Sequence, residues 1–305
     1  LTIGLPIQRR HITTQPNNKY HSFITQPYHN TKQMTYKAIV LDLDGTLTNN
    51  KKEITPKTRE ALLSAQRNGM CVILASGRPT YGIRPLADEL QIGQQGGYVM
   101  AYNGGCVTQW DSKAIIFNQT LNADLVPILY RAAKEDSRHF EILTYQGEGI
   151  AATDISNEYV RHEAFINKMP LTQYDDFVHQ VQYPINKCLI VGDPTPLALL
   201  ERHLAQTLQG QCSVYRSADF FLECVPLGID KAASLARLLP TLGLTREEII
   251  AVGDGHNDIS MIEYAGLGVA MANAADATKA KADYITRSNE EDGVAHVLQK
   301  FCGVE

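Results

Sequence analysis

The sequence predicts an α/β fold in which a parallel-sheet core is interrupted by an inserted α+β domain. From Lys37 to the end of the chain, short apolar runs alternate with helix-like stretches, which is the pattern of a parallel sheet covered by helices. Between roughly Asn118 and Pro226 the strand-like runs are more polar, and the helices lie between them in a less regular order. This change of pattern indicates a domain inserted into the core.

The core elements follow from uniformly apolar runs and from the signals at their ends. The run 38–41 has no polar alternation, as expected for a strand buried on both faces. Thr55-Pro56 is a helix start with proline in the first turn, and Gly69 is the matching stop. The other expected strands are 70–75, 98–102, 249–252, 267–270 and 284–286, with turn or capping signals at 76–79, 103–105 and 245–248.

The inserted segment is expected to combine helices and strands. Its helices should cover 124–134 and 193–209, the second beginning at Asp193-Pro194. Its strands should cover 140–145, 149–153, 187–191, 213–216 and 220–225.

Composition and charge exclude several classes of protein. The chain has 305 residues, 44% of them hydrophobic and 20% charged, which is long enough for two domains and excludes intrinsic disorder. We find no apolar run approaching the ~20 residues that span a bilayer, so we expect no membrane partner. A formal net charge of −5 and a pI near 6.0 give no general reason to bind nucleic acid.

The cysteines and the first residues bear on location. The six cysteines are scattered without a CxxC pair, which predicts buried thiols in a reducing, cytoplasmic compartment rather than a zinc site or disulfide framework. Residues 1–33 contain four Lys/Arg and no acidic residue, and they lack the apolar core of a secretory signal. We expect this segment to be a leader outside the fold, added or translated from upstream, with a targeting segment as the alternative. Met34 is the expected natural start.

Carboxylates gather where two apolar strands end. Asp42 and Asp44 follow the first strand, and Asp254 and Asp258 follow the run 249–252. Since ligands bind at the carboxyl ends of parallel strands, the two groups can meet in one anionic pocket. Such a pocket needs a cation, and oxygen ligands without Cys or His favour magnesium over zinc. If the first strand stays extended, Asp42 and Asp44 point to one side about 6 to 7 Å apart.

These segments resemble the motifs of the haloacid dehalogenase-like (HAD) superfamily. Asp42-Leu43-Asp44-Gly45-Thr46 resembles the first motif, Ser76 the Ser/Thr of the second, Lys231 the lysine of the third, and Gly253-Asp254-Gly255-His256-Asn257-Asp258 the GDGxND of the fourth. The run Asn289-Glu290-Glu291-Asp292-Gly293-Val294 and the insertion resemble the Cof-type phosphatases with a C2-type cap, subclass IIB. The resemblance covers about 34–305. It implies a Rossmann-like catalytic core of 34–117 and 226–305, and a cap of 118–225.

The resemblance also implies roles for the site residues. Asp42 would be the nucleophile that forms an aspartyl-phosphate, and Asp44 the general acid and then the general base. The side chains of Asp42 and Asp254 and the main-chain carbonyl of Asp44 would hold Mg²⁺. Ser76, Gly77 and Asn257 would bind the phosphoryl group, and Lys231 would neutralise charge on it and on Asp42. Asp258 would either complete the outer metal shell or orient Lys231.

Several residues near these motifs keep two interpretations. Arg78 and Asn103 follow strand ends where substrate could pass, but turn formation and helix contact explain them as well. Glu223, on the last strand of the insertion, either contacts substrate or lies on a solvated strand face. His256 occupies the variable position of its motif, which favours a surface or cap contact over catalysis.

The sequence thus predicts a Mg²⁺-dependent phosphatase acting on a small phosphorylated metabolite, with a sugar phosphate as the first candidate. The cap should close over the site, with hinges near Asn118 and Pro226. One alternative is a phosphomutase, which passes the phosphoryl group to another hydroxyl. The other is a phospho-accepting signalling module, which Asp44 and the large insertion argue against, because an acid/base two residues from Asp42 promotes hydrolysis. The sequence indicates no oligomeric state.

Overall fold

The computed structural model describes residues 36–134 and 139–304 of the chain. The predicted leader, 1–33, lies outside the described residues. The described strands form two sheets, one of eight strands and one of six, and helices pack on both. The predicted α/β class is confirmed.

The eight-stranded sheet has the order β14-β13-β12-β1-β2-β3-β4-β5. Six of its strands pair in parallel: β1 (Ala38–Leu41), β2 (Cys71–Ala75), β3 (Tyr98–Ala101), β12 (Ile249–Gly253), β13 (Leu267–Ala270) and β14 (Tyr284–Ile285). β4 (Cys106–Gln109) and β5 (Ile115–Asn118) pair antiparallel at one edge. The predicted hairpin signal explains this departure from an all-parallel sheet, because Tyr102, Asn103 and Gly104 all have positive φ and reverse the chain after β3.

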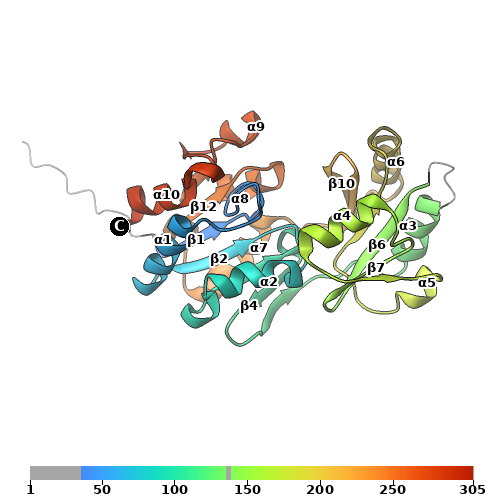
Figure 1. Ribbon diagram of the computed structural model, residues 1–305, viewed down its shortest axis with the longest axis horizontal. Helices are drawn as coiled ribbons and strands as arrows, with labels where there is room; N and C mark the ends of the chain where they lie inside the picture. The colour runs from blue at the N-terminus through green and yellow to red at the C-terminus, as the bar shows by residue number, and fades with distance from the viewer. Residues whose placement is uncertain (1–35, 135–138, 305) are drawn as a thin grey trace, which may run out of the picture. The chain divides into compact units, whose positions relative to one another are not determined.

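Helices cover both faces of this sheet (Figure 1). α1 (Pro56–Arg67), α2 (Thr80–Glu89) and α10 (Gly293–Cys302) pack on the face that carries Ile39, Leu41, Val72 and Leu74. α7 (Lys231–Leu238) and α8 (Ile259–Tyr264) pack on the face that carries Val40 and Ile73. The short α9 (Asp276–Lys279) follows β13. Burial on both faces is why the central strands β1, β2 and β12 are apolar.

Two local predictions show how the end signals act. The predicted start of α1 is confirmed, since the Oγ1 of Thr55 accepts a hydrogen bond from the N–H of Thr58 at 3.2 Å. The predicted capping box at Thr245 and Glu248 is also present, but it begins only a single 3₁₀ turn before β12. β12 starts at Ile249, directly after that turn, so no longer helix forms there.

The six-stranded sheet lies within the segment predicted to be inserted. Its order is β10-β11-β9-β6-β7-β8, and its strands are β6 (Glu141–Gln146), β7 (Gly149–Ala152), β8 (Leu171–Gln173), β9 (Cys188–Val191), β10 (Ser213–Ala218) and β11 (Phe221–Val225). α3 (Leu125–Lys134) and α6 (Pro194–Thr207) pack on one face, whereas α4 (Glu158–Asn167) packs on the other. α5 (Phe177–Gln180) is a single turn that places Phe177 against α3.

The sequence predicted most elements of this segment but not α4, α5 or β8. The buried face of α4 includes the polar residues Glu163 and Asn167, so the apolar periodicity that marks a helix is weak there. β8 is a three-residue strand with two exposed positions. Short polar elements of this kind are fixed by their neighbours rather than by their own pattern.

Two further observations concern the whole described chain. All six cysteines are free, and four of them are buried. No helix of the described residues combines the length and the apolar character that crossing a membrane would require.

Candidate active site

Three neighbouring strands deliver the predicted residues to one edge of the eight-stranded sheet. β12, β1 and β2 are adjacent, and at their carboxyl ends follow Asp254, Asp42 and Ser76. The N–H of Asp42 donates to the carbonyl of Val252 at 3.0 Å, so the chain beyond β1 stays paired with β12 for one further residue. This is the edge at which open α/β sheets bind ligands.

Asp42, Asp254 and Asp258 form a carboxylate cluster. Each offers one oxygen, and these three oxygens lie within 4.8 Å of one another. Gly45 permits this approach: its φ is +84°, and a Cβ there would lie 2.4 Å from Asp254 Oδ2. The Oγ1 of Thr46 donates to Asp254 Oδ1 at 2.7 Å and fixes that carboxylate. The loop after β1 is therefore shaped around Asp254.

Lys231 supplies the positive charge of the cluster. It is the first residue of α7, and its side chain is 0% exposed. Its Nζ donates to Asp42 Oδ1 at 2.7 Å and to Asp258 Oδ1 at 2.5 Å. Burial alone would lower the pKa of Lys231, but the charges of Asp258 and Asp42 outweigh burial and raise it, so the ammonium form persists.

Asp258 is held by its own loop as well as by Lys231. Its Oδ2 accepts hydrogen bonds from the N–H groups of Asp254 and Gly255 at 2.9 and 2.8 Å. Gly253 leaves room for it, since a Cβ at Gly253 would lie 2.4 Å from the Cβ of Asp258. Both oxygens of Asp258 thus have protein donors, which favours the interpretation that it orients Lys231.

The electrostatics of the cluster fit a divalent cation. Burial, followed by the nearby charge of Asp258, raises the pKa of Asp42 to about 8, and burial also raises that of Asp254 to about 6. The three carboxylates and the Lys231 ammonium carry a formal charge of −2 when all are ionised. A hard divalent cation with oxygen ligands would balance this charge, and the set contains no Cys or His.

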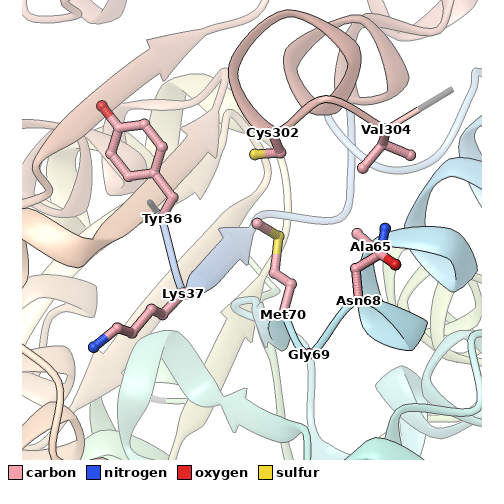
Figure 2. A pocket seen from close by; sticks show the side chains of 8 residues that line it. All are labelled: Tyr36, Lys37, Ala65, Asn68, Gly69, Met70, Cys302 and Val304. Carbon is pink, nitrogen blue, oxygen red and sulfur yellow. The ribbon is translucent and has the colours of Figure 1, made fainter. Parts of the chain in front are cut away.

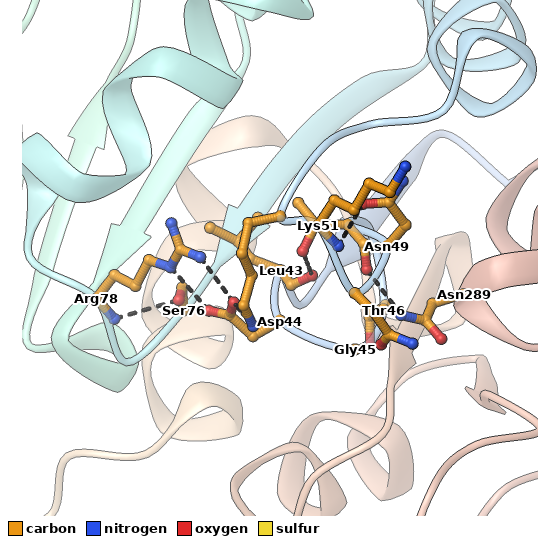
Figure 3. Close-up of polar contacts among 12 residues, drawn as sticks. Leu43, Asp44, Gly45, Thr46, Asn49, Lys51, Ser76, Arg78 and Asn289 are labelled. Atoms are coloured by element: carbon orange, nitrogen blue, oxygen red, sulfur yellow. Dashed lines mark hydrogen bonds and ion pairs between the residues drawn. The ribbon is translucent and has the colours of Figure 1, made fainter. Parts of the chain in front are cut away.

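Asp44 lies in a different environment from Asp42. The chain turns from Leu43 onward, directly after Asp42. The condition of an extended strand, under which Asp42 and Asp44 would point to one side, is therefore not met. The carboxylate of Asp44 instead faces Arg78, whose Nε and Nη2 donate to its two oxygens at 2.7 Å each (Figure 3). Lys52 Nζ also donates to it at 2.7 Å.

These cations determine the protonation of Asp44. Burial alone would raise its pKa, but the hydrogen bonds and charges of Arg78 and Lys52 outweigh burial and lower it to about 2. The side chain of Arg78 is only 9% exposed, whereas that of Asp44 is 35% exposed. Arg78 therefore does more than form the turn after β2. Turn formation was one of the two interpretations that the sequence left open for it.

The turn after β2 brings the predicted phosphate-binding residues Ser76 and Gly77 to the same edge. Ser76 is buried, and its Oγ accepts the N–H of Arg78 at 3.2 Å (Figure 3). The carbonyl of Gly77 accepts a hydrogen bond from Lys187 Nζ, which comes from the second sheet, at 3.2 Å. Gly77 also lies against the side chain of Asn103.

Asn257 reaches the same group from the loop after β12. Its Nδ2 donates to Asn103 Oδ1 at 3.0 Å, and Asn103 Nδ2 donates to the hydroxyl of Tyr215 at 3.0 Å. Asn103 therefore connects the loop after β12 with the second sheet. His256, the neighbour of Asn257, is exposed.

The late run 289–294 braces the loop after β1. Asn289 Nδ2 donates to the carbonyl of Thr48 at 3.0 Å. Thr55 Oγ1 donates to Asp292 Oδ1 at 2.5 Å, and the N–H of Asn50 donates to Glu290 Oε1 at 2.6 Å. The resemblance singled out this run, and its contacts show that its polar residues hold the chain between Asp44 and α1.

A cavity of about 170 Å³ lies elsewhere in the fold (Figure 2). Its lining includes Tyr36 and Lys37, which precede β1, and Gly69 and Met70, which precede β2. It therefore opens at the amino ends of these strands, whereas the carboxylates follow their carboxyl ends. The cavity is not part of the candidate active site.

The structure thus brings Asp42, Asp254, Asp258 and Lys231 together. The Asp44 carboxylate, Ser76, Gly77 and Asn257 lie in loops after the same strands. Sequence reasoning did not identify Thr46 as the partner of Asp254 or Lys52 as a partner of Asp44. For Thr46, its place in the first motif could have indicated such a role. Sequence reasoning also missed Lys187 and Tyr215, and one of its two interpretations of Glu223 is wrong, because Glu223 is 4% exposed rather than solvated.

Comparisons with known proteins agree with this geometry. The family model described as haloacid dehalogenase-like hydrolase matches residues 39–298. A crystal structure of a haloacid dehalogenase-like hydrolase from Bacteroides thetaiotaomicron is 51% identical, with a TM-score of 0.84, covering 87% of this chain and 99% of that one. YxeH of Bacillus subtilis is 32% identical over 268 residues, covering 87% of this chain and 98% of YxeH. The 5-amino-6-(5-phospho-D-ribitylamino)uracil phosphatase YcsE of Bacillus subtilis is 30% identical over 270 residues, covering 87% and 95%.

Proposed function

Because this chain belongs to the haloacid dehalogenase-like hydrolase family, we propose that it is a Mg²⁺-dependent phosphatase that hydrolyses small phosphorylated metabolites. The observation that carries the proposal is the buried Asp42, ion-paired to a fully buried Lys231 and clustered with Asp254 and Asp258. A buried carboxylate in a site that balances a divalent cation is suited to attack a phosphoryl group.

In the first step, an oxygen of Asp42 attacks phosphorus. The bond between Asp42 and phosphorus forms while the bond to the leaving oxygen breaks, and Asp44 gives a proton to that oxygen. Lys231 holds Asp42 in position and offsets negative charge as the transfer proceeds. The carboxylates of Asp42 and Asp254 and the main-chain carbonyl of Asp44 would hold Mg²⁺, which when bound would offset negative charge on the phosphoryl group.

In the second step, Asp44 acts as a base. It takes a proton from water as that water attacks phosphorus, and the bond to Asp42 breaks, which releases phosphate and regenerates the nucleophile. The low pKa of Asp44 suits this step, since the carboxylate form is the base. In the first step the proton must be present, so Arg78 and Lys52 have to withdraw from Asp44 before the alcohol leaves.

The phosphoryl group needs further donors. We assign this role to Ser76, whose hydroxyl lies at the end of β2, to the backbone of Gly77 and to Asn257. Asp258 is assigned to the orientation of Lys231, in keeping with its hydrogen bond to the ammonium group.

The second sheet is proposed to be a C2-type cap. We assign 118–225 to the cap and 34–117 with 226–305 to the catalytic core; the ends of β5 at Asn118 and of β11 at Val225 support these bounds. Motion about hinges near Asn118 and Pro226 would admit substrate and then exclude water. A sugar phosphate is our first candidate substrate, because the relative YcsE is named for a substrate whose phosphate sits on a ribityl chain. The free cysteines support a reducing, cytoplasmic location.

Phosphate release tests the proposal. The purified chain should release phosphate from simple phosphomonoesters when Mg²⁺ is present, and Asp42→Asn should abolish release while the circular dichroism spectrum is unchanged. Asp219→Asn, at a side chain that is 85% exposed, is the matched control and should keep full activity. Normal turnover by Asp42→Asn would end the nucleophile assignment. An isomeric sugar phosphate without free phosphate would indicate a mutase, and a phospho-aspartate lasting minutes would indicate a signalling module.

A further inference from the structure

We propose that Lys187 and Glu223 form a specificity site that binds hydroxyl groups of the leaving alcohol and selects neutral polyol phosphates. This inference rests on the proposed phosphatase function. The mechanism above gives neither residue a task, yet their side chains are 4% and 6% exposed, and Lys187 Nζ lies 3.2 Å from Glu223 Oε1. A buried ion pair outside the catalytic cluster therefore needs a reason.

The register of the second sheet places this pair on one face. Cys224 pairs with Cys188 between β11 and β9, so Glu223 and Lys187, each one residue before, project to the opposite side from these cysteines. Thr144 pairs with Cys188 between β6 and β9, which sets Tyr145 beside Lys187. Lys187 Nζ accordingly lies 5.3 Å from the centre of the Tyr145 ring.

Hydrogen bonds connect this face with the catalytic edge. Lys187 Nζ donates to the carbonyl of Gly77 at 3.2 Å, next to Ser76. The Tyr215 hydroxyl donates to Glu223 Oε2 at 3.4 Å and accepts from Asn103 Nδ2 at 3.0 Å. Since Asn103 also contacts Asn257, the pair joins the two loops that are assigned to phosphate binding. A leaving alcohol whose phosphate lies at those loops would extend toward the pair.

Stability does not explain the pair. Removing two charges from water costs several kcal/mol per ion, and apolar side chains of similar volume often stabilise such a position equally well or better. The same face of the second sheet carries the apolar residues Leu143, Ile150 and Leu189 beside the pair. An ammonium and a carboxylate in this place are therefore better explained by a ligand than by packing.

The pair retains capacity for hydrogen bonds. An ammonium has three N–H donors. Among the described residues, Lys187 Nζ has two acceptors, the carbonyl of Gly77 and the carboxylate of Glu223. A carboxylate has about four acceptor positions, and Glu223 receives hydrogen bonds from Lys187 and Tyr215 within the same part of the chain.

This chemistry selects the class of substrate. Neighbouring hydroxyl groups both donate and accept, so one can donate to Glu223 while the next accepts from Lys187. The two residues together are neutral and therefore offer no net attraction to a carboxylate or an amine on the substrate. The ring of Tyr145 borders the ammonium and supplies an apolar wall for the carbon chain of a polyol.

Two matched substrates test the inference. Ribitol 5-phosphate and n-pentyl phosphate have the same carbon chain length and the same phosphate, and only the first carries hydroxyl groups. We expect the wild-type enzyme with Mg²⁺ to prefer ribitol 5-phosphate in kcat/KM by at least about tenfold, since hydrogen bonds to charged groups are stronger than those between neutral groups.

Variants of the pair should remove this preference. Glu223→Gln and Lys187→Met should each lower kcat/KM for ribitol 5-phosphate by about 10- to 100-fold, while n-pentyl phosphate changes less than about threefold. Tyr215→Phe, which keeps the ring and removes one donor to Glu223, should give a smaller loss in the same direction. Glu201→Gln is the matched control. Glu201 lies on α6, which covers the other face of the same sheet, and it pairs with Arg216 of β10.

The outcomes separate the two proposals. Equal losses for both substrates in Glu223→Gln and Tyr215→Phe would show that the pair only holds the two sheets together and would overturn the inference. Wild-type activity on both substrates without a preference would also overturn it and leave the phosphatase function standing. Release of phosphate from neither substrate would remove the phosphatase function, and the inference would fall with it.

Discussion

Replacing Lys231 with methionine should destabilise the metal-free protein strongly. Methionine keeps much of the unbranched side-chain volume but removes the ammonium that donates to Asp42 and Asp258 at 2.7 and 2.5 Å. Breaking a buried pair by removing one partner typically costs about 3–5 kcal/mol, because the other charge remains buried. Here two carboxylates lose the same partner, so we expect Lys231→Met to lie at the upper end of that range.

The loss should depend on pH in a defined direction. Burial and Asp258 raise the pKa of Asp42 from 3.8 to about 8, so the folded protein binds more protons than the unfolded chain between these values. The contribution of Asp42 to stability is therefore greatest below pH 4 and is lost as the pH rises toward 8. Without Lys231, which lowers the pKa of Asp42, the deficit of the variant should be larger at pH 8 than at pH 5.

Urea unfolding measures both effects. The free energy of unfolding would be compared for the wild type and Lys231→Met at pH 5 and pH 8, in EDTA and with added Mg²⁺. Mg²⁺ should stabilise the variant more than the wild type at pH 8, because the site then has one positive charge fewer. Lys281→Met, which breaks an exposed pair with Glu263, should change stability by less than about 1 kcal/mol. A Lys231→Met protein as stable as the wild type in EDTA at pH 8 would refute this reasoning.

Three further substitutions test separate parts of the site. Gly45→Ala should lower phosphate release by at least tenfold, because its Cβ would lie 2.4 Å from Asp254 Oδ2 at a φ of +84°; unchanged kinetics would show that the loop relaxes freely. Asp44→Asn should lower kcat by about 10²–10⁴-fold. With p-nitrophenyl phosphate, whose leaving group needs no acid, mass spectrometry should detect phosphorylated Asp42 in this variant. An unmodified enzyme would contradict the assignment of Asp44 as the base. EDTA should abolish activity in the wild type, and Asp254→Asn should raise the Mg²⁺ concentration that gives half-maximal rate; an unaltered metal requirement would exclude Asp254 as a ligand.

The sequence was sufficient to predict the parallel core and the convergence of its carboxylates. Asp42 and Asp254 each follow an apolar run of the sequence. These runs form the neighbouring strands β1 and β12, so the two carboxylates meet at one edge of the sheet. Lys231 lies 189 residues from Asp42 in sequence and contacts it directly. Its placement came from the resemblance, because a lone lysine at a helix start has no pattern of its own.

The geometry of Asp44 could not be predicted in the same way. The strand does not stay extended to Asp44, because the chain turns after Asp42, and that turn includes Gly45 and Thr46, which contact Asp254. The partners of Asp44 come from two other segments, Arg78 after β2 and Lys52 before α1. Only the folded loops bring them together.

The pair Lys187 and Glu223 was hidden for a different reason. Each residue belongs to a run of mainly apolar residues, where a single charge is compatible with either a solvated or a buried position. Their contact depends on the register between β9 and β11, and that between β9 and β6 sets Tyr145 beside them. Strand register is a tertiary property, and one sequence contains no local signal for it.

The contrast between Asp42 and Asp44 supports the proposal that the site takes a cation from solution. A nucleophile must be ionised at neutral pH, yet burial raises the pKa of Asp42 to about 8 although Lys231 is in contact with it. Asp44, two residues along the chain, has a pKa of about 2 because Arg78 and Lys52 outweigh its burial. Two of the protein's own cations therefore pair with Asp44, the proposed proton-transfer residue, whereas Lys231 is shared between Asp42 and Asp258. A divalent cation held by Asp42 and Asp254 would complete the balance, so ionisation of Asp42, the proposed nucleophile, should follow metal binding.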